Sequence, residues 1–217
     1  MKIDIARQPL VPAFMTLFAL AVAAMCAGIP VPDTETSGAV REALPLLGGQ
    51  LAWFQAAYPV WSKFAAGFML LFAGMCTGRI SIRYNLYTVG TCLPIPLYAI
   101  VACGIATGGN YLAGFAASML LALATKNYCR AFCNGYGFDA IFRASLYLGL
   151  MPLIYAPALP LLLLLPLAVL LFRRTFREVV VATAGLLLPI FTACYVSWGS
   201  GAEFTAPLVT VGQSAIE

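Results

Sequence analysis

The chain has 217 residues, of which 62% are hydrophobic and 9% are charged, and its formal net charge is +4 at pH 7. Since a soluble domain carries about 25% charged residues, this composition excludes an ordinary water-soluble protein. The chain contains no histidine, which excludes a Ser-His-Asp triad and removes the commonest metal ligand. It also has no basic soluble domain, so we expect no nucleic acid partner.

Apolar stretches long enough to cross a bilayer recur along the chain. About 20 apolar residues cross roughly 30 Å of hydrocarbon as a helix, in which the backbone groups bond to one another. The sequence therefore predicts an all-α fold, a polytopic transmembrane helix bundle that forms a single integral membrane domain over 1–217. We expect about seven spans, at residues 10–29, 61–77, 87–106, 111–125, 142–155, 158–172 and 179–198.

The first predicted span, Leu10 to Ile29, also has features of a signal peptide, because Lys2 and Arg7 precede it. Its 20-residue apolar length favours a span that is retained. Lipoprotein cleavage before Cys26 requires a small residue directly before the cysteine, and Met25 fits that position poorly. Cleavage stays the alternative, and it would leave the orientation of the later spans unchanged.

Residues 30–60 form a predicted external loop whose second half is rich in aromatic residues. Trp53, Tyr58 and Trp61 lie within nine residues of one another. Trp and Tyr prefer the headgroup level of a bilayer, so we expect interfacial anchors on a helix in the membrane plane or at an early start of the second span. A docking surface for a lipid-linked ligand is the alternative.

The region from Phe142 to Phe172 is too long for one comfortable span and short for two. Tyr155-Ala156-Pro157 interrupts it near the middle. Two short helices, 142–155 and 158–172, would need a locally thin bilayer or burial against neighbouring helices, or they would form a re-entrant hairpin. Both interpretations leave the two ends of the region on the same side of the membrane.

Basic residues gather on one side of the membrane when the spans are threaded in this way. Short loops that hold Lys and Arg are retained in the cytoplasm. With the amino terminus inside and the tail 199–217 outside, ten of the twelve basic residues are cytoplasmic, and the exceptions are Arg41 and Lys63. A single crossing by 142–172 would reduce this split to seven against five. The distribution favours the hairpin and predicts a multi-pass membrane protein whose basic face is toward the cytoplasm.

The densest charge cluster joins the last two spans. Arg173, Arg174 and Arg177 lie within five residues, and at the headgroup level they would attract anionic lipid by about 1 kcal/mol each. Guanidinium groups also bind phosphate with two parallel hydrogen bonds. We expect this turn to determine topology and to contact lipid, and a ligand phosphate is the alternative.

Asp139 and Arg143 are four residues apart, which predicts an ion pair on one helix face. The alternative places them in a cytoplasmic cavity with Lys126, Arg130 and Arg177. Either way, we expect no catalytic residue, because the predicted spans carry almost no ionisable groups and these usually mark an intramembrane active or transport site.

The seven cysteines are odd in number and lack paired spacing, which argues against a disulfide framework. Cys129 and Cys133 are one helical turn apart and could form half of a metal site. With no second pair and no histidine, we expect small buried hydrophobic side chains, and neither a metal nor a cofactor.

Several short motifs in the carboxy-terminal third form a pattern: Phe138-Asp139, Ser145-Leu146-Tyr147, Tyr155-Ala156-Pro157, a leucine-rich run to Phe172-Arg173, Phe176-Arg177-Glu178 and Gly185-Leu186-Leu187-Leu188-Pro189. Over residues 112–195 the chain resembles an uncharacterised family of multi-spanning inner-membrane proteins of Bacteroidetes-type bacteria. The resemblance implies no catalytic role, and it implies a chain shorter than most members. Some relatives carry a carotene-oxygenase label, but such enzymes hold iron with four histidines, which this chain lacks.

Three functions are open at this point. Spans without charge offer partner helices mainly a packing surface, which favours a non-enzymatic component of an envelope assembly, bound to a membrane protein partner or to a second copy of this chain. Seven prolines in or beside the spans favour a transporter or flippase for a small or lipid-linked solute. A membrane glycosyl-transferring enzyme is third, with Asp33, Glu35 or Glu42 as its external acid.

Overall fold

The structure is a computed structural model that describes residues 10–26, 46–84, 92–105, 110–133, 137–164 and 175–214. Within these ranges every regular element is a helix and no strand is present, so the predicted all-α class is confirmed for this part of the chain. The predictions made for the remaining residues lie outside the described part of the chain, which leaves out 1–9, 27–45, 85–91, 106–109, 134–136, 165–174 and 215–217.

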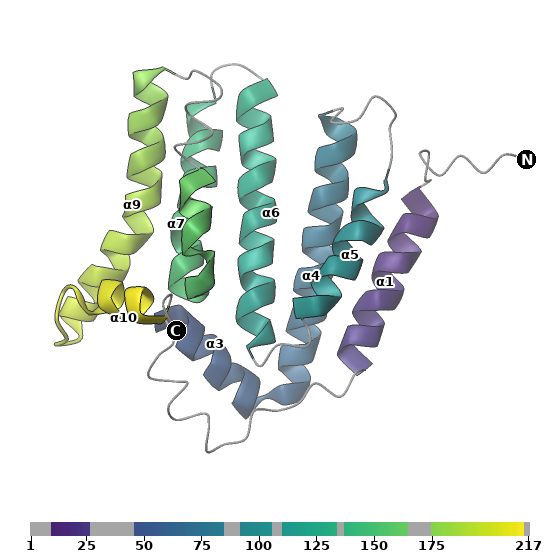
Figure 1. Cartoon of the computed structure of the whole chain (residues 1–217), viewed down its shortest axis with the longest axis horizontal. Coiled ribbons are helices and arrows are strands. Elements are labelled where there is room, and N and C mark those ends of the chain that lie inside the picture. Colours follow the sequence, from purple (N-terminus) through teal and green to yellow (C-terminus); the bar gives the residue numbers. More distant parts are fainter. Residues whose placement is uncertain are drawn as a thin grey trace, which may run out of the picture.

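Most of the helices stand side by side in a row (Figure 1). They are α1 (Leu10–Cys26), α4 (Pro59–Arg83), α5 (Pro94–Ile105), α6 (Tyr111–Cys133), α7 (Phe138–Ile154) and α9 (Phe176–Gly199). The other elements are α3 (Leu46–Ala57), the 3-10 helix η1 (Ala156–Leu163) and α10 (Ala206–Ser214). α9 packs on α7, α7 on α6 and α6 on α4, while α1 and α5 pack on α4 and on each other.

The described helices pack in two larger hydrophobic cores and a small cluster of Ala73, Cys76 and Ala122, and all three contain residues of α6. One core joins α6 to α7, with Leu148 and Met151 among its buried residues. The other joins α6 to α1, α4 and α5 around Leu17, Leu70 and Phe115. The helix α6 therefore holds the two halves of the row together.

Glycines allow the closest approaches between helices. A Cβ atom on Gly149 of α7 would overlap the carbonyl oxygen of Leu186 in α9, and one on Gly185 would lie 2.7 Å from the carbonyl oxygen of Phe142. Small residues at such positions let helix backbones pack closely, which is a common source of association between membrane helices. The contact between α7 and α9 depends on these two glycines.

Helix lengths differ from the predicted spans because a helix continues after its apolar stretch ends. α4 begins at Pro59, a residue suited to a first helical position, and it extends past predicted residue 77 to Arg83. α6 extends past predicted residue 125 to Cys133. Lys126 and Arg130 thus lie on the helix rather than in a loop beyond it.

Two helices in the described part of the chain are long and apolar enough to cross a membrane, Pro59–Arg83 and Phe176–Gly199. The helices Leu10–Cys26 and Pro94–Gly104 are apolar but shorter. The arrangement of seven spans stays a prediction.

The helix ends that carry most of the described basic residues share one end of the row, the upper end in Figure 1, which we call the basic end. α1, α5, α7 and α9 begin at this end, and α4 and α6 finish there. Six of the seven described basic residues lie on these helix ends: Arg79, Arg83, Lys126, Arg130, Arg143 and Arg177. The seventh, Lys63, lies near the start of α4, at the opposite end.

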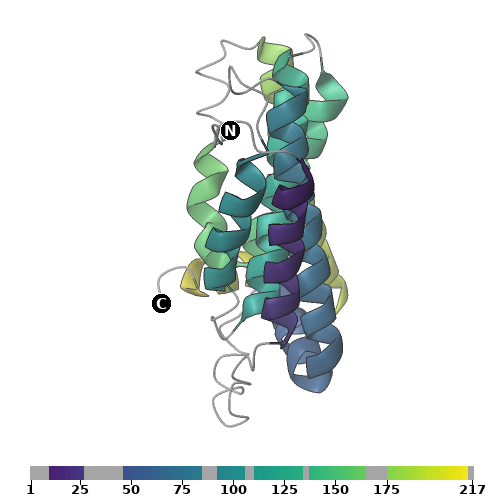
Figure 2. The same cartoon turned by 90° about the vertical axis from the view of Figure 1, so that its right-hand side faces the viewer.

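The chain returns to the basic end between α7 and α9. α7 runs away from this end and α9 begins at it again (Figure 1). η1 packs on α7, and Figure 2 shows it to one side of the row, together with α5. α7 ends at Ile154, at the predicted break, and the described part of the predicted helix 158–172 belongs mostly to the 3-10 helix Ala156–Leu163. Residues 165–174 lie outside the described residues, so the hairpin stays a prediction.

Candidate functional site

A pocket of about 380 Å³ opens at the basic end between α1, α4, α5 and α6. Its polar lining is cationic, with Arg79 and Arg83 from α4 and Lys126 from α6. Its other lining residues are mostly apolar and include Phe72 and Ile82. The pocket therefore combines a positive rim with an apolar wall.

Local sequence explains how these cations meet. Arg79 and Arg83 are four residues apart, so they share a face of α4, and α4 carries them because it continues beyond its apolar stretch. Gly78 leaves room for Ile95 of α5, since a Cβ atom there would overlap the Ile95 side chain. Helix packing at a glycine thus closes one wall of the pocket.

The pocket cations lack carboxylate partners in the described part of the chain, where the ion pair found is between Arg143 and Asp139. Arg83 lies in the last turn of α4. A cation is favoured at such a position by the helix dipole. Among the described residues, no carboxylate therefore offsets the positive charge of the pocket.

The predicted ligand residues on α7 and α9 lie outside this pocket. Arg143 Nε donates to Asp139 Oδ1 at 3.0 Å, as the spacing predicts, and the two side chains are 58% and 66% exposed. Arg177 is exposed in the first turn of α9. Arg173 and Arg174 lie outside the described residues. Of the cavity predicted from Lys126, Arg130, Asp139, Arg143 and Arg177, Lys126 alone lines the pocket.

A buried carboxylate, Glu178, was not singled out from the sequence. It is 2% exposed in the first turn of α9, where the helix dipole favours a negative charge. It lies on the same buried face as Ala182, Gly185 and Pro189. That spacing of four, seven and eleven residues is the signal that could have identified it as a buried position.

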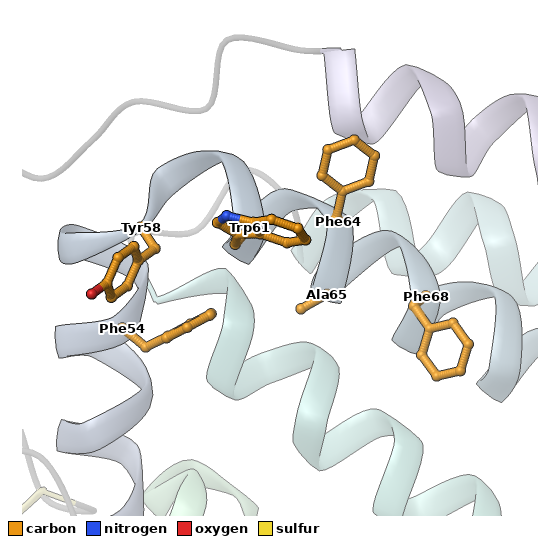
Figure 3. Close-up of a pocket in the computed structure, with 6 residues that line it drawn as sticks. All are labelled: Phe54, Tyr58, Trp61, Phe64, Ala65 and Phe68. Atoms are coloured by element: carbon orange, nitrogen blue, oxygen red, sulfur yellow. The ribbon is translucent and has the colours of Figure 1, made fainter.

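An aromatic groove of about 550 Å³ lies at the end opposite the basic end, where α3 meets α4 (Figure 3). Its lining consists of Phe54, Tyr58, Trp61, Phe64, Ala65 and Phe68. The structure brings the predicted anchors together, since Trp53 contacts Tyr58 edge-on with ring centroids 6.3 Å apart. Trp61 is 68% exposed. The groove is an open surface, with room for apolar chains.

Buried polar contacts fix α3 and α4 against α6 beside this groove. The hydroxyls of Ser62 and Tyr111 are hydrogen-bonded at 2.6 Å. The backbone N–H of Leu112 donates to Gln55 Oε1 at 3.4 Å, which satisfies a donor in the first turn of α6. These bonds orient the helix junction that forms the groove.

A cleft of about 660 Å³ lies between α5, α6, α7 and η1. α5 and η1 are on the same side of the row (Figure 2), and small residues of α6, Gly114, Ala117 and Ser118, form its floor. Asn110 and Tyr155 add polar groups near the end that carries the aromatic groove. No charged side chain is among its described lining residues.

The described residues contain no group of three or more His, Cys, Asp or Glu side chains placed to hold a metal ion. The side chain of Cys133 and the external acids Asp33, Glu35 and Glu42 lie outside the described part.

Comparison of the chain with protein-family models, curated proteins and solved structures gives no match. The resemblance over residues 112–195, and what it implies, therefore stays a prediction.

Proposed function

We propose that this protein is a multi-pass inner-membrane protein that acts as a non-enzymatic structural component, binding a partner helix through α9. The observation that carries the proposal is the exposure of α9. It is a 24-residue apolar helix at one edge of the row, and 22% of its apolar window is buried, against 50% for α4. A long apolar face at an edge suits helix association within a membrane.

A band without charge across the row supports placement in a bilayer. In the described residues it comprises 64–78 of α4, 110–125 of α6, 144–164 through α7 and η1, and 179–199 of α9. At 1.5 Å per residue, the stretch in α9 is about 30 Å long, close to the thickness of the hydrocarbon core. In that placement the basic end faces the cytoplasm, because short loops with Lys and Arg are retained there. This orientation agrees with the proposed seven spans, with the amino terminus inside and the carboxy terminus outside.

The exposed face of α9 supplies the surface for a partner. Leu187, Leu188 and Phe191 are exposed in the middle of the helix, whereas Gly185 and Pro189, on the face that packs against α7, are buried. Charged groups are absent from this stretch of α9, so association there relies on close packing rather than on ion pairs. The occupant is a membrane protein helix or a second copy of this chain.

A photo-crosslinker at Phe191, introduced in the native membrane, tests this proposal. We expect a protein adduct of defined mass, either a dimer or a heteromer. The matched control is a crosslinker at Met15, an exposed residue of α1 at the other edge of the row. Lipid adducts alone from Phe191, as from Met15, would refute a partner on α9.

The cleft favours a second function, a flippase for a lipid-linked solute. It lies beside a 3-10 helix that contains Pro157 and Pro160, and broken helices at a cleft build binding sites in transporters. The test is exchange of a fluorescent lipid between leaflets of proteoliposomes. A flippase exchanges the lipid faster than empty liposomes do, and Ser118→Leu, which fills the cleft floor, slows the exchange. Exchange at the empty-liposome rate would exclude this function for that lipid.

A further inference from the structure

The pocket at the basic end lies where a row of exposed apolar side chains on α4 reaches the cations. Phe68, Phe72 and Met75 are exposed on α4 at spacings of four and three residues, and Arg79 follows four residues later. The rings of Phe68 and Phe72 stack with centroids 6.4 Å apart. This surface changes from apolar to cationic along the helix. It is therefore complementary to an amphiphile whose apolar chain ends in an anionic head.

We propose that this pocket binds one anionic phospholipid of the cytoplasmic leaflet. Arg79, Arg83 and Lys126 contact its phosphate, and an acyl chain lies along Phe72 and Phe68. The inference rests on the membrane orientation proposed above, but not on a partner at α9.

Charge and position both select an anionic lipid. Two guanidinium groups present paired donors that match phosphate oxygens, and an ammonium adds a third positive charge. Basic pockets between helices on the cytoplasmic side are suited to lipid headgroups. A free phosphate would use the cations but would leave the apolar wall, with Phe72, Met75 and Ile95, without a function.

The structure separates this pocket from the general positive charge of the basic end. Arg130 lies at the same end on α6, is exposed, and is not among the pocket-lining residues. A lipid held by the pocket depends on Arg79, Arg83 and Lys126, whereas lipid attracted by surface charge alone depends on Arg130 to the same extent. Arg130 is therefore a matched control.

The experiment titrates the full-length protein, purified in a mild neutral detergent, with phosphatidylglycerol, phosphatidylcholine or inorganic phosphate, and measures binding by native mass spectrometry. We expect saturable binding of one phosphatidylglycerol and at least tenfold weaker binding of phosphatidylcholine. At about fivefold per cation, the variant R79Q/R83Q/K126Q should bind phosphatidylglycerol about a hundredfold more weakly. Arg130→Gln should stay within about twofold of the original protein because a charge outside the pocket contributes little.

Further variants keep the result interpretable if the triple variant unfolds. Arg83→Gln changes an exposed side chain and should weaken phosphatidylglycerol binding about fivefold. Phe72→Ala should weaken the binding of phosphatidylglycerol but not that of phosphate. Equal weakening by Arg83→Gln and Arg130→Gln, equal binding of both lipids, or inorganic phosphate binding as tightly as phosphatidylglycerol would each overturn the proposal. Reporter fusions test the orientation separately, so failure of the lipid site would not be confused with failure of the topology.

Discussion

Replacing Gly149 by alanine tests the packing of α7 on α9. The added Cβ atom would overlap the carbonyl oxygen of Leu186, and its other near neighbours are the Leu186 carbonyl carbon and Pro189. A backbone carbonyl within a helix cannot swing aside as a flexible side chain can, so the two helices must separate. Overpacking against a rigid backbone group costs about 2 to 3 kcal/mol, in the upper part of the range for overpacked cores, and the better helix propensity of alanine returns about 1 kcal/mol.

We therefore expect Gly149→Ala to lower the free energy of unfolding by about 1 to 2 kcal/mol. For a chain of this size, that lowers the melting temperature by about 2 to 8 °C. The assay is thermal unfolding of the purified protein in a mild detergent. Gly104→Ala is the matched control, because nothing lies within 4 Å of a Cβ atom built on that glycine in α5, and it should unfold at the same temperature or higher.

A second glycine separates this explanation from a local effect of Gly149. Gly185→Ala, whose Cβ atom would lie 2.7 Å from the carbonyl oxygen of Phe142, should also destabilise. The free energy of unfolding of the double variant should fall by less than the sum of the two single decreases, because one separation of the helices relieves both contacts. A Gly149→Ala protein that melts at or above the original temperature would refute the close contact between α7 and α9.

Three further predictions concern polar contacts and membrane depth. Ser62→Ala should lower the free energy of unfolding by about 1 to 3 kcal/mol in a thermal unfolding assay, since it leaves the buried hydroxyl of Tyr111 without this partner. In a protein that already carries Tyr111→Phe, Ser62→Ala should lower it by less, and an equal loss would contradict the hydrogen bond. Arg143→Gln should change stability by less than about 0.5 kcal/mol, because its ion pair is exposed, and a loss above about 1 kcal/mol would show that the pair is buried in the assembled protein. The three tryptophans, all exposed and remote from the basic end, should be quenched more by lipids labelled at the headgroup than by lipids labelled at the acyl-chain end, and the reverse order would place them in the bilayer centre.

The sequence predicts those features that depend on neighbouring residues. The break at Pro157 and the aromatic cluster at Trp53, Tyr58 and Trp61 are local, and the structure places both where expected. The common end of the basic residues also follows from the order of the chain. Each span changes the side of the membrane, and most basic residues lie in connections on the same side once the spans are threaded.

The pocket and the buried carboxylate depend on how distant segments pack, and the sequence predicts them less well. The predicted spans 61–77 and 87–106 leave Arg79 and Arg83 in the connection between them, but their meeting with Lys126 requires α4 and α6 to continue as helices past their apolar stretches. Glu178 belongs to a predicted basic turn, yet the packing of α9 on α7 covers its side chain. Composition alone does not distinguish the covered face of a helix terminus from the exposed one.

The central claim is that the basic end faces the cytoplasm and that the chain crosses the membrane an odd number of times. Paired reporter fusions in living cells test it, using alkaline phosphatase, which is active outside the inner membrane, and green fluorescent protein, which fluoresces inside. Fusions after Gly109, Ala156 and Glu217 should show phosphatase activity, and the control fusion after Gly137, near the basic end, should fluoresce. Fluorescence from the fusion after Glu217 would contradict the account.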